Sequence, residues 1–280
     1  MMRPHAALFI ATVTMLVTTG SAHAWGVLGH QIAAAIAKRN LGSAHVRAID
    51  ALLADARIGG GDMIGAAAFA DDYRIGHPHT GPWHYVNVPL DATEYSEERD
   101  CHTDFQQRRV ADRPCVVAQI LAAKTRLGDT RLTSAERGLA AAMLIHFIAD
   151  IHQPLHTTTR NDRGGNSVVA SWFGETTNLH AVWDVKIVER RYGVDADPVK
   201  VAEMLDARVA AAERRAWCNG ASIDWANEGI AAARAVVYPS IAGSPVTLAD
   251  AYHERAAPVV DQRLTRAGVR LACALRSALE

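Results

Sequence analysis

Met143-Leu-Ile-His-Phe-Ile-Ala-Asp-Ile-His-Gln-Pro-Leu-His156 is the stretch around which the chain is organised. Its pattern predicts the end of an apolar helix that leads directly into a metal site. His146 and Asp150 are four residues apart, so their side chains lie on one face of that helix. Pro154 lacks a backbone N–H and restricts the residue before it, so the helix should end just ahead of it. His156 follows in a loop that can fold it back towards the pair.

A second pair of the same kind lies downstream. In Asn178-Leu-His-Ala-Val-Trp-Asp184, His180 and Asp184 are again four residues apart. One such pair is usually exposed, but both pairs here lie in apolar helices, where buried polar groups need partners. Zinc takes His nitrogen and Asp oxygen, and two pairs plus His156 exceed what one zinc ion needs. The sequence therefore predicts a site for more than one metal ion.

The rest of the chain shows mostly helical periodicity. Thr133-Ser-Ala-Glu136 is a capping box, which should begin the central helix. Gly164-Gly165-Asn166 followed by Ser167–Phe173 predicts the one β-hairpin. The other predicted helices are Leu28–Asn40, Ser43–Ala56, Asp62–Arg74, Pro114–Leu127, Asn178–Tyr192, Asp197–Trp217, Ser222–Tyr238 and Thr247–Leu279, the last being one helix or a pair, broken or kinked at Pro258. We expect a mainly α fold, a single all-helical domain over residues 25–280 with one small β-hairpin.

The composition suits such a domain and limits its partners. The chain has 280 residues, of which 49% are hydrophobic, enough for a large core. A net charge of −1 argues against binding nucleic acid through a broad basic surface. A nuclease that draws phosphate with metal ions remains compatible with it. Because no coiled-coil pattern is present, we expect a monomer, and no protein partner is implied.

The first 24 residues predict a signal peptide. Arg3 supplies the positive start, Ala6–Thr18 the short apolar core, and Ala22-His23-Ala24 the small-x-small cleavage site. Cleavage would make Trp25 the mature N-terminus. No other apolar run is long enough for a membrane anchor. We therefore expect an exported protein, periplasmic or secreted, without membrane association.

Four cysteines fit an oxidising destination. Cys101 and Cys115 flank one short segment, and Cys218 and Cys273 lie in the C-terminal third. Four cysteines allow three pairings. We favour Cys101–Cys115 and Cys218–Cys273, because the first closes a local loop and the second ties two late helices together. The alternative is a set of free buried thiols.

Candidate metal ligands occur along more than half of the chain: His30, Asp71, His84, His146, Asp150, His156, His180 and Asp184. His30 gains weight because it lies five residues after the predicted mature terminus. A free α-amino group titrates at about 7.7–8.0, so the Trp25 amine can be neutral and bind metal. The Trp25 carbonyl would then close a chelate ring.

Six short motifs together resemble one enzyme family. They are Trp25-Gly-x-x-Gly-His30, Ala70-Asp71-x-x-Arg74, Trp83-His84-Tyr85-Val86-Asn87, His146-Phe-Ile-Ala-Asp150-x-x-Gln-Pro-Leu-His156, Gly164-Gly165-Asn166 and Asn178-Leu-His-x-x-Trp-Asp184. In this order they resemble the zinc-dependent single-strand nucleases of fungi and plants, the S-one/P-one type, and their bacterial relatives, which also act as 3′-nucleotidases. The match runs from Trp25 to about Tyr192, and the tail beyond carries no motif.

The resemblance implies three zinc ions as cofactors. One would be held by Asp71, His84, His146 and Asp150, and a second by His156, His180 and Asp184. The third would take the Trp25 amino nitrogen and carbonyl oxygen, His30 and Asp150. Asp150 would then bridge two of the ions.

The resemblance also implies roles around the phosphate. Asp71 would orient the attacking water and accept its proton. Arg74, one helical turn along, and Asn166, behind two glycines, would bind phosphate oxygens. The alternatives are an Arg74 paired with Asp72 on the surface and an Asn166 that only shapes a turn.

The resemblance also implies that two residues close behind the predicted ligand His84 bind the substrate. Tyr85 would stack on a base, which suits single strands, and Asn87 would contact the base edge. Family members carry Asp in the second place, so the base preference stays open. The expected activity is hydrolysis of single-stranded DNA and RNA to 5′-mononucleotides.

Two alternatives to a nuclease remain at this point. Zinc-dependent bacterial phospholipase C is a relative, but its members tend to carry Glu where this chain has Asp184. A periplasmic zinc-binding protein without catalysis would need neither Arg74 nor Asn166.

Overall fold

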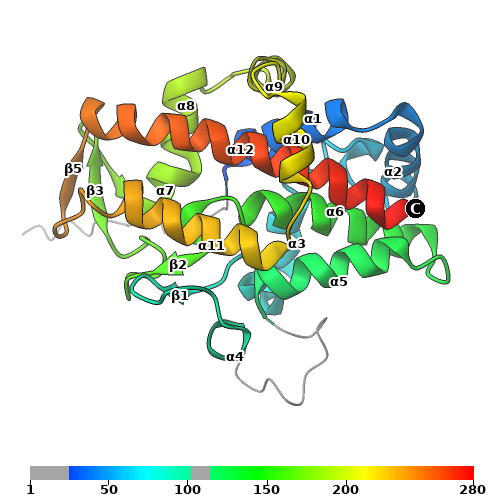
Figure 1. Cartoon of the computed structure of the whole chain (residues 1–280), viewed down its shortest axis with the longest axis horizontal. Helices are drawn as coiled ribbons and strands as arrows, with labels where there is room; N and C mark the ends of the chain where they lie inside the picture. Colours follow the sequence, from blue (N-terminus) through cyan, green and yellow to red (C-terminus); the bar gives the residue numbers. More distant parts are fainter. Residues whose placement is uncertain (1–24, 102–113) are drawn as a thin grey trace, which may run out of the picture.

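The computed structural model describes residues 25–101 and 114–280, and it is mainly α-helical, as predicted (Figure 1). The predicted signal peptide and the segment 102–113 lie outside the described residues. The α-helices are α1 Val27–Asn40, α2 Ser43–Asp55, α3 Phe69–Gly76, α4 Glu97–Asp100, α5 Val116–Gly128, α6 Ser134–Asp150, α7 Leu179–Ala181, α8 Ile187–Tyr192, α9 Pro198–Asp206, α10 Ala211–Trp217, α11 Ser222–Ala232 and α12 Asp250–Leu279. The shorter helical turns are η1 Gly59–Gly61, η2 Pro78–His84, η5 Pro154–His156, η6 Val182–Lys186 and η7 Ala233–Val237, the last two being π-helical.

Helix α6 runs through the middle of the molecule. It begins at the predicted capping box, where the Thr133 hydroxyl accepts from the Glu136 N–H at 3.2 Å and the Glu136 carboxylate accepts from the Thr133 N–H at 2.9 Å. Every residue from Ala140 to Asp150 is buried, because α1, α2, α5 and α12 pack around it (Figure 1). The end of α6 therefore lies inside the protein, where polar side chains need partners.

Helix α12 crosses most of the length of the molecule as one element (Figure 1). The expected break at Pro258 is wrong, because the helix continues through it. Pro258 is exposed, so water can satisfy the backbone carbonyl that loses its partner. The segment just before the helix, Val246–Leu248, is a strand rather than part of it.

Two further helix predictions need correction. The helix predicted over Asp62–Arg74 starts only at Phe69, because the Asp62 carboxylate accepts from the N–H groups of Ile64 and Gly65 and holds a turn instead. The helix predicted over Asp197–Trp217 is divided into α9 and α10.

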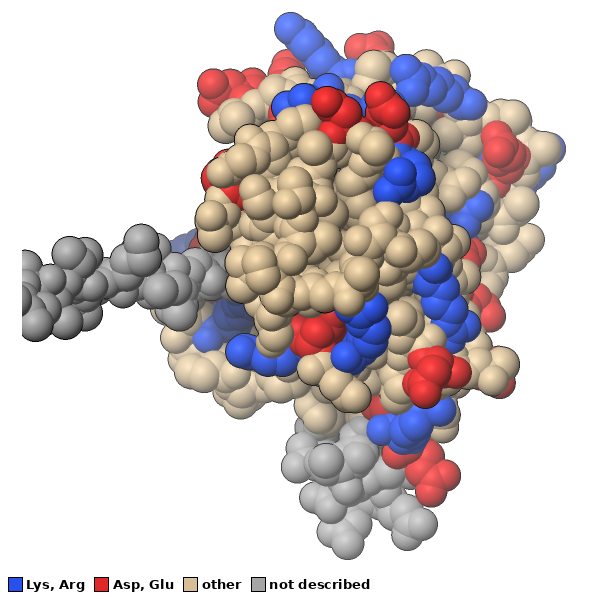
Figure 2. Space-filling view, turned by 90° about the vertical axis from the view of Figure 1, so that its left-hand side faces the viewer, with Lys and Arg blue, Asp and Glu red and all other residues tan. Residues whose placement is uncertain are grey.

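The strands form two small sheets: β3 Val169–Trp172 with β4 Glu175–Asn178 and β5 Val246–Leu248, and β1 Val88–Pro89 with β2 Thr158–Thr159. The predicted hairpin is β3–β4, closed by a turn in which Phe173 and Gly174 both have positive φ. The sequence did not indicate β5, which pairs parallel to β3. Figure 2 shows the end of the molecule that carries this sheet, with a broad area free of charged side chains and charges around its edge.

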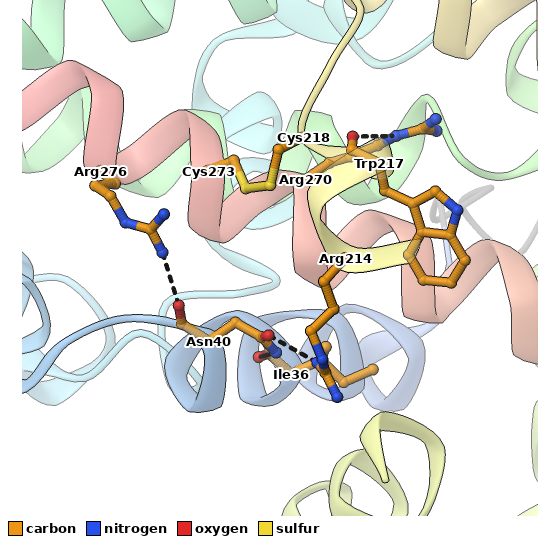
Figure 3. Close-up of a disulfide and its surroundings, with 8 residues drawn as sticks. All are labelled: Ile36, Asn40, Arg214, Trp217, Cys218, Arg270, Cys273 and Arg276. Carbon is orange, nitrogen blue, oxygen red and sulfur yellow. Dashed lines mark hydrogen bonds between the residues drawn. A yellow bond between two sulfur atoms is a disulfide. The ribbon is translucent and has the colours of Figure 1, made fainter. Parts of the chain in front are cut away.

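Both favoured disulfides are present. Cys101–Cys115 closes the local loop, and Cys218–Cys273 joins the end of α10 to α12 (Figure 3). Next to it, Arg276 donates to the backbone carbonyl of Asn40 at the end of α1, at 2.9 Å. In the described part of the chain, no helix is both long and apolar enough to cross a membrane.

The crossing of α1 and α12 leaves no room for a larger residue at Gly268. A Cβ there would come within 2.4 Å of the Ile36 Cβ. We expect Gly268→Ala to lower the free energy of unfolding by about 1–3 kcal/mol in urea denaturation, because α1 and α12 must separate. Gly76→Ala is the control, since nothing lies within 4 Å of that position. Equal stability of the two variants would contradict the prediction.

Candidate metal centre

The buried end of α6 brings the predicted ligands together. In the described residues, ligand atoms gather in three groups, within each of which they lie no more than 4.8 Å apart: His30, Asp71 and His146; His84, His146 and Asp150; His156, His180 and Asp184. All eight of these side chains are buried. The site joins five parts of the chain that are distant in sequence, so it exists only in the folded protein.

Helices α1 and α3 carry His30 and Asp71, and short helical turns place three of the other candidate ligands. His84 ends η2 and His156 ends η5, whose first residue is Pro154. Asp184 lies in the π-helical turn η6, and its Oδ2 atom is 3.0 Å from His180 Nε2. Single π-turns inside helices are frequent at functional sites, because they change the direction of one side chain.

Backbone carbonyls fix the orientation of three imidazoles. Nδ1 donates from His146 to Ala67 at 2.9 Å, from His156 to His84 at 2.9 Å, and from His180 to Gly164 at 2.6 Å. Because a carbonyl only accepts, Nδ1 carries a hydrogen, and Nε2 is the ring nitrogen left to face a metal ion. Histidines that bind metals are usually held in this way.

Asp150 lies at the centre of the site. Its carboxylate is 3.0 Å from His30 Nε2, 3.0 Å from His84 Nδ1, 3.3 Å from His146 Nε2 and 4.0 Å from His156 Nδ1. Burial alone would raise the pKa of Asp150, but the surrounding imidazoles hold it well below its usual range. An ionised carboxylate therefore lies among ligands from all three groups.

The residues present fit metal ions. Asp71, Asp150 and Asp184 are at most 3% exposed, and three buried carboxylates require positive charge nearby. Within the described part of the chain, His84 Nε2 and His156 Nε2 are buried without a hydrogen-bond partner. Nitrogen and oxygen from His and Asp are the donor set that zinc takes.

The residue predicted to begin the mature protein lies in this site. The Trp25 side chain is fully buried, and its indole N–H donates to the Ala149 carbonyl at 2.9 Å. The Gly26 N–H donates to the Asp184 carbonyl at 2.7 Å, and the Trp25 carbonyl contacts His30 Nδ1. The start of the domain is therefore anchored next to two predicted ligands.

The residues predicted to contact the substrate lie at the rim. The Arg74 guanidinium is 3.5 Å from Asp71 Oδ1, and no ion pair with Asp72 is seen among the described residues. Tyr85 and Asn87 point outward from the extended segment after η2, and Tyr85 is 37% exposed. Asn166 is half-buried, and its side-chain amide donates to the Arg163 carbonyl at 2.9 Å.

Comparison with known proteins identifies the family of this chain. A protein-family model described as S1/P1 Nuclease matches residues 25–280. The chain belongs to the S1/P1 nuclease family. Endonuclease 2 of Arabidopsis thaliana is 31% identical, over 97% of this chain and 96% of its own length. Nuclease P1 of Penicillium citrinum and Nuclease S1 of Aspergillus oryzae are each 26% identical over 89% of this chain, and over 95% and 90% of their own lengths.

The family assignment makes the chain a nuclease and decides against the phospholipase and non-catalytic alternatives. It also extends the resemblance, because the S1/P1 nuclease match continues through the tail in which no motif was found. That tail, α9 to α12, packs on the back of the metal centre.

Gln153 is a site residue that sequence reasoning left without a role. Its side-chain amide donates to Asp184 Oδ1 at 2.5 Å and accepts from the Leu155 N–H at 2.6 Å. It thus links the turn after α6 to a ligand on η6. Its position between the predicted ligands of the His146–His156 stretch could have indicated such a role.

Arg263 of α12, which was also not predicted, completes the end of α6. It is 2% exposed, and it donates to the carbonyls of His152 at 2.8 Å and Ile151 at 3.2 Å. Its charge is balanced by Glu228, 3.0 Å away. A positive side chain at a helix C-terminus also opposes the negative end of the helix dipole.

His152 belongs to this support and not to the metal site. It donates from Nδ1 to the Ile148 carbonyl at 2.7 Å and its Nε2 accepts from Arg270 at 2.9 Å. Burial, and then the charges of Arg263 and Arg270, hold the pKa of His152 well below its usual value. It therefore stays neutral with both ring nitrogens used.

We expect Arg263→Met to lower the free energy of unfolding by about 3 kcal/mol, because the carbonyls of Ile151, His152 and Trp225 lose this donor. Urea denaturation of metal-free and metal-loaded protein measures it. The metal-loaded protein should lose more, since the turn that carries the ligands is loosened.

Arg266→Met is the matched control, because Arg266 is partly exposed and donates to Glu228 but to none of the carbonyls that Arg263 binds. If both substitutions lowered the free energy of unfolding equally, the role assigned to Arg263 at the end of α6 would be contradicted.

Proposed function

We propose that residues 1–24 are a signal peptide and that residues 25–280 form an exported, monomeric, trinuclear zinc phosphodiesterase. It hydrolyses single-stranded DNA and RNA to 5′-mononucleotides and also acts as a 3′-nucleotidase. The observation that carries this proposal is the gathering of buried His and Asp side chains in three groups, with the Asp150 carboxylate within 4.0 Å of a histidine from each. The two disulfides agree with an oxidising destination.

The proposed zinc sites use the eight side chains of these groups, but His30 and Asp71, which lie in one group with His146, are assigned to different ions. Asp71, His84, His146 and Asp150 hold one ion, and His156, His180 and Asp184 hold another. The third takes the Trp25 amine and carbonyl, His30 and Asp150. The short contact between the Trp25 carbonyl and His30 supports this third set.

Charge explains how a nearly neutral chain holds phosphate. Three dipositive ions bring six positive charges, three ligand carboxylates remove three, and about +3 remains in the cleft. Bound zinc lowers the pKa of water and neutralises charge on the phosphate. Asp71 orients the attacking water and accepts its proton, while Arg74 beside it contacts a phosphate oxygen.

The rim residues account for single-strand substrates. Tyr85 presents an exposed ring on which an unpaired base stacks, and Asn87, on the same outward face, contacts the base edge. The Asn166 amide has a second N–H beyond the one given to Arg163, and this N–H binds a phosphate oxygen. Bases in a duplex are already stacked and cannot reach Tyr85.

The decisive experiment counts zinc by elemental analysis in protein that begins at Trp25. Single-stranded RNA, 3′-AMP and phosphatidylcholine are assayed in parallel. We expect about three zinc ions per chain and cleavage of both nucleotide substrates but not of the lipid. Bound zinc without turnover of RNA or 3′-AMP would contradict the proposal.

A variant with one extra residue before Trp25 tests the terminal site. An amide nitrogen does not replace the amine as a ligand, so we expect about two zinc ions per chain and a large loss of activity. Titration with a chelator should remove the third ion first from the unextended protein. An unchanged zinc count in the extended variant would show that the amine is not a ligand.

A further inference from the structure

An open hollow of about 580 Å³ lies beside the metal centre, at the far end of the β1–β2 ladder. Its walls include Leu90 and Asp91 after β1, Arg160 after β2, and Arg234 and Tyr238 in and after η7. None of these residues belongs to the metal centre or to the base-contacting rim.

The ladder connects the hollow to the metal ligands. The Val86 N–H donates to the carbonyl of the ligand His156 at 2.8 Å, at the start of the ladder. The Leu90 N–H donates to the Thr159 carbonyl at 2.9 Å, at its end. The three residues from His156 to Thr159 span at most about 11 Å, so the hollow begins within about that distance of His156.

The residues just before β1 alternate between exposed and buried side chains. Tyr85 and Asn87 are exposed, whereas the alternate residues Val86 and Val88 are buried. A nucleic-acid strand whose base stacks on Tyr85 can follow this exposed side, and the hollow lies where β1 ends.

Two arginines in the hollow are held in place by backbone carbonyls and not by carboxylates. Arg160 donates to the Ile241 carbonyl at 3.0 Å, and its guanidinium lies 4.8 Å from the centre of the Tyr238 ring. Arg234 donates to the Leu90 carbonyl at 2.6 Å and also to that of Ala92. Both side chains are exposed, and neither forms an ion pair with a carboxylate of the described residues.

We propose that Arg160 and Arg234 form a phosphate subsite for the single strand beyond the nucleotide bound at the metal centre, an inference that rests on the proposed function. Guanidinium groups bind phosphodiester oxygens through paired N–H donors, and both arginines keep N–H groups free of the carbonyl bonds. The contact is to the backbone, so it adds affinity for long strands without a sequence preference.

The test compares a single-stranded oligonucleotide of about ten nucleotides with 3′-AMP, at several salt concentrations. Arg160→Gln and Arg234→Gln should each lower kcat/KM on the oligonucleotide about threefold and leave 3′-AMP hydrolysis unchanged. Each should also reduce the slope of log kcat/KM against log salt by about 0.7, the value for one lost phosphate contact to a single strand. Arg160→Lys should keep most of the slope.

Arg215→Gln is the matched control, since Arg215 is exposed on α10, which lies away from β1 (Figure 1). Thermal unfolding of each variant checks that the protein is folded. If Arg234→Gln is unstable, the test rests on Arg160→Gln alone. Equal losses on both substrates, or an unchanged salt slope with an active wild type, would overturn the subsite alone. A wild type that cleaves neither substrate would overturn the proposed function and the subsite with it.

Discussion

The structure depends on a buried negative charge at the C-terminal end of a buried helix. The Asp150 carboxylate is fully enclosed, and the helix dipole of α6 adds negative potential at the same place. Such a site is stable only when positive charge surrounds it. Imidazoles and the proposed metal ions lie on one side, and the guanidinium of Arg263 lies on the other.

This arrangement gives the two halves of the chain different tasks. The chain up to η6 carries the candidate metal ligands, whereas α12 supplies the support behind them. Arg263 and Arg270 share Glu228, and the disulfide at Cys273 joins α12 to the end of α10. The C-terminal part of the chain therefore supports the structure of the site, although it provides none of the candidate ligands.

The main helices and the pairing of the candidate ligands could be predicted from the sequence, because those features rest on local spacing. The pairs His146–Asp150 and His180–Asp184 meet because residues four apart share a helix face, and the capping box fixes the start of α6. The late start of α3, the strand β5 and the role of Arg263 could not be predicted in this way. Each depends on a competing turn or on a partner distant in the chain: the Asp62 turn, strand β3 and the end of α6.

The anchoring of Trp25 has a consequence for the timing of activity in the cell. Its indole and the following N–H hold the domain's first residues against Ala149 and Asp184. As long as the proposed leader remained attached, the nitrogen of Trp25 would be an amide and the proposed third zinc site would be incomplete. Removal of the leader at the membrane would then be the activating step, so the cytoplasmic RNA of the producing cell would never meet a finished enzyme.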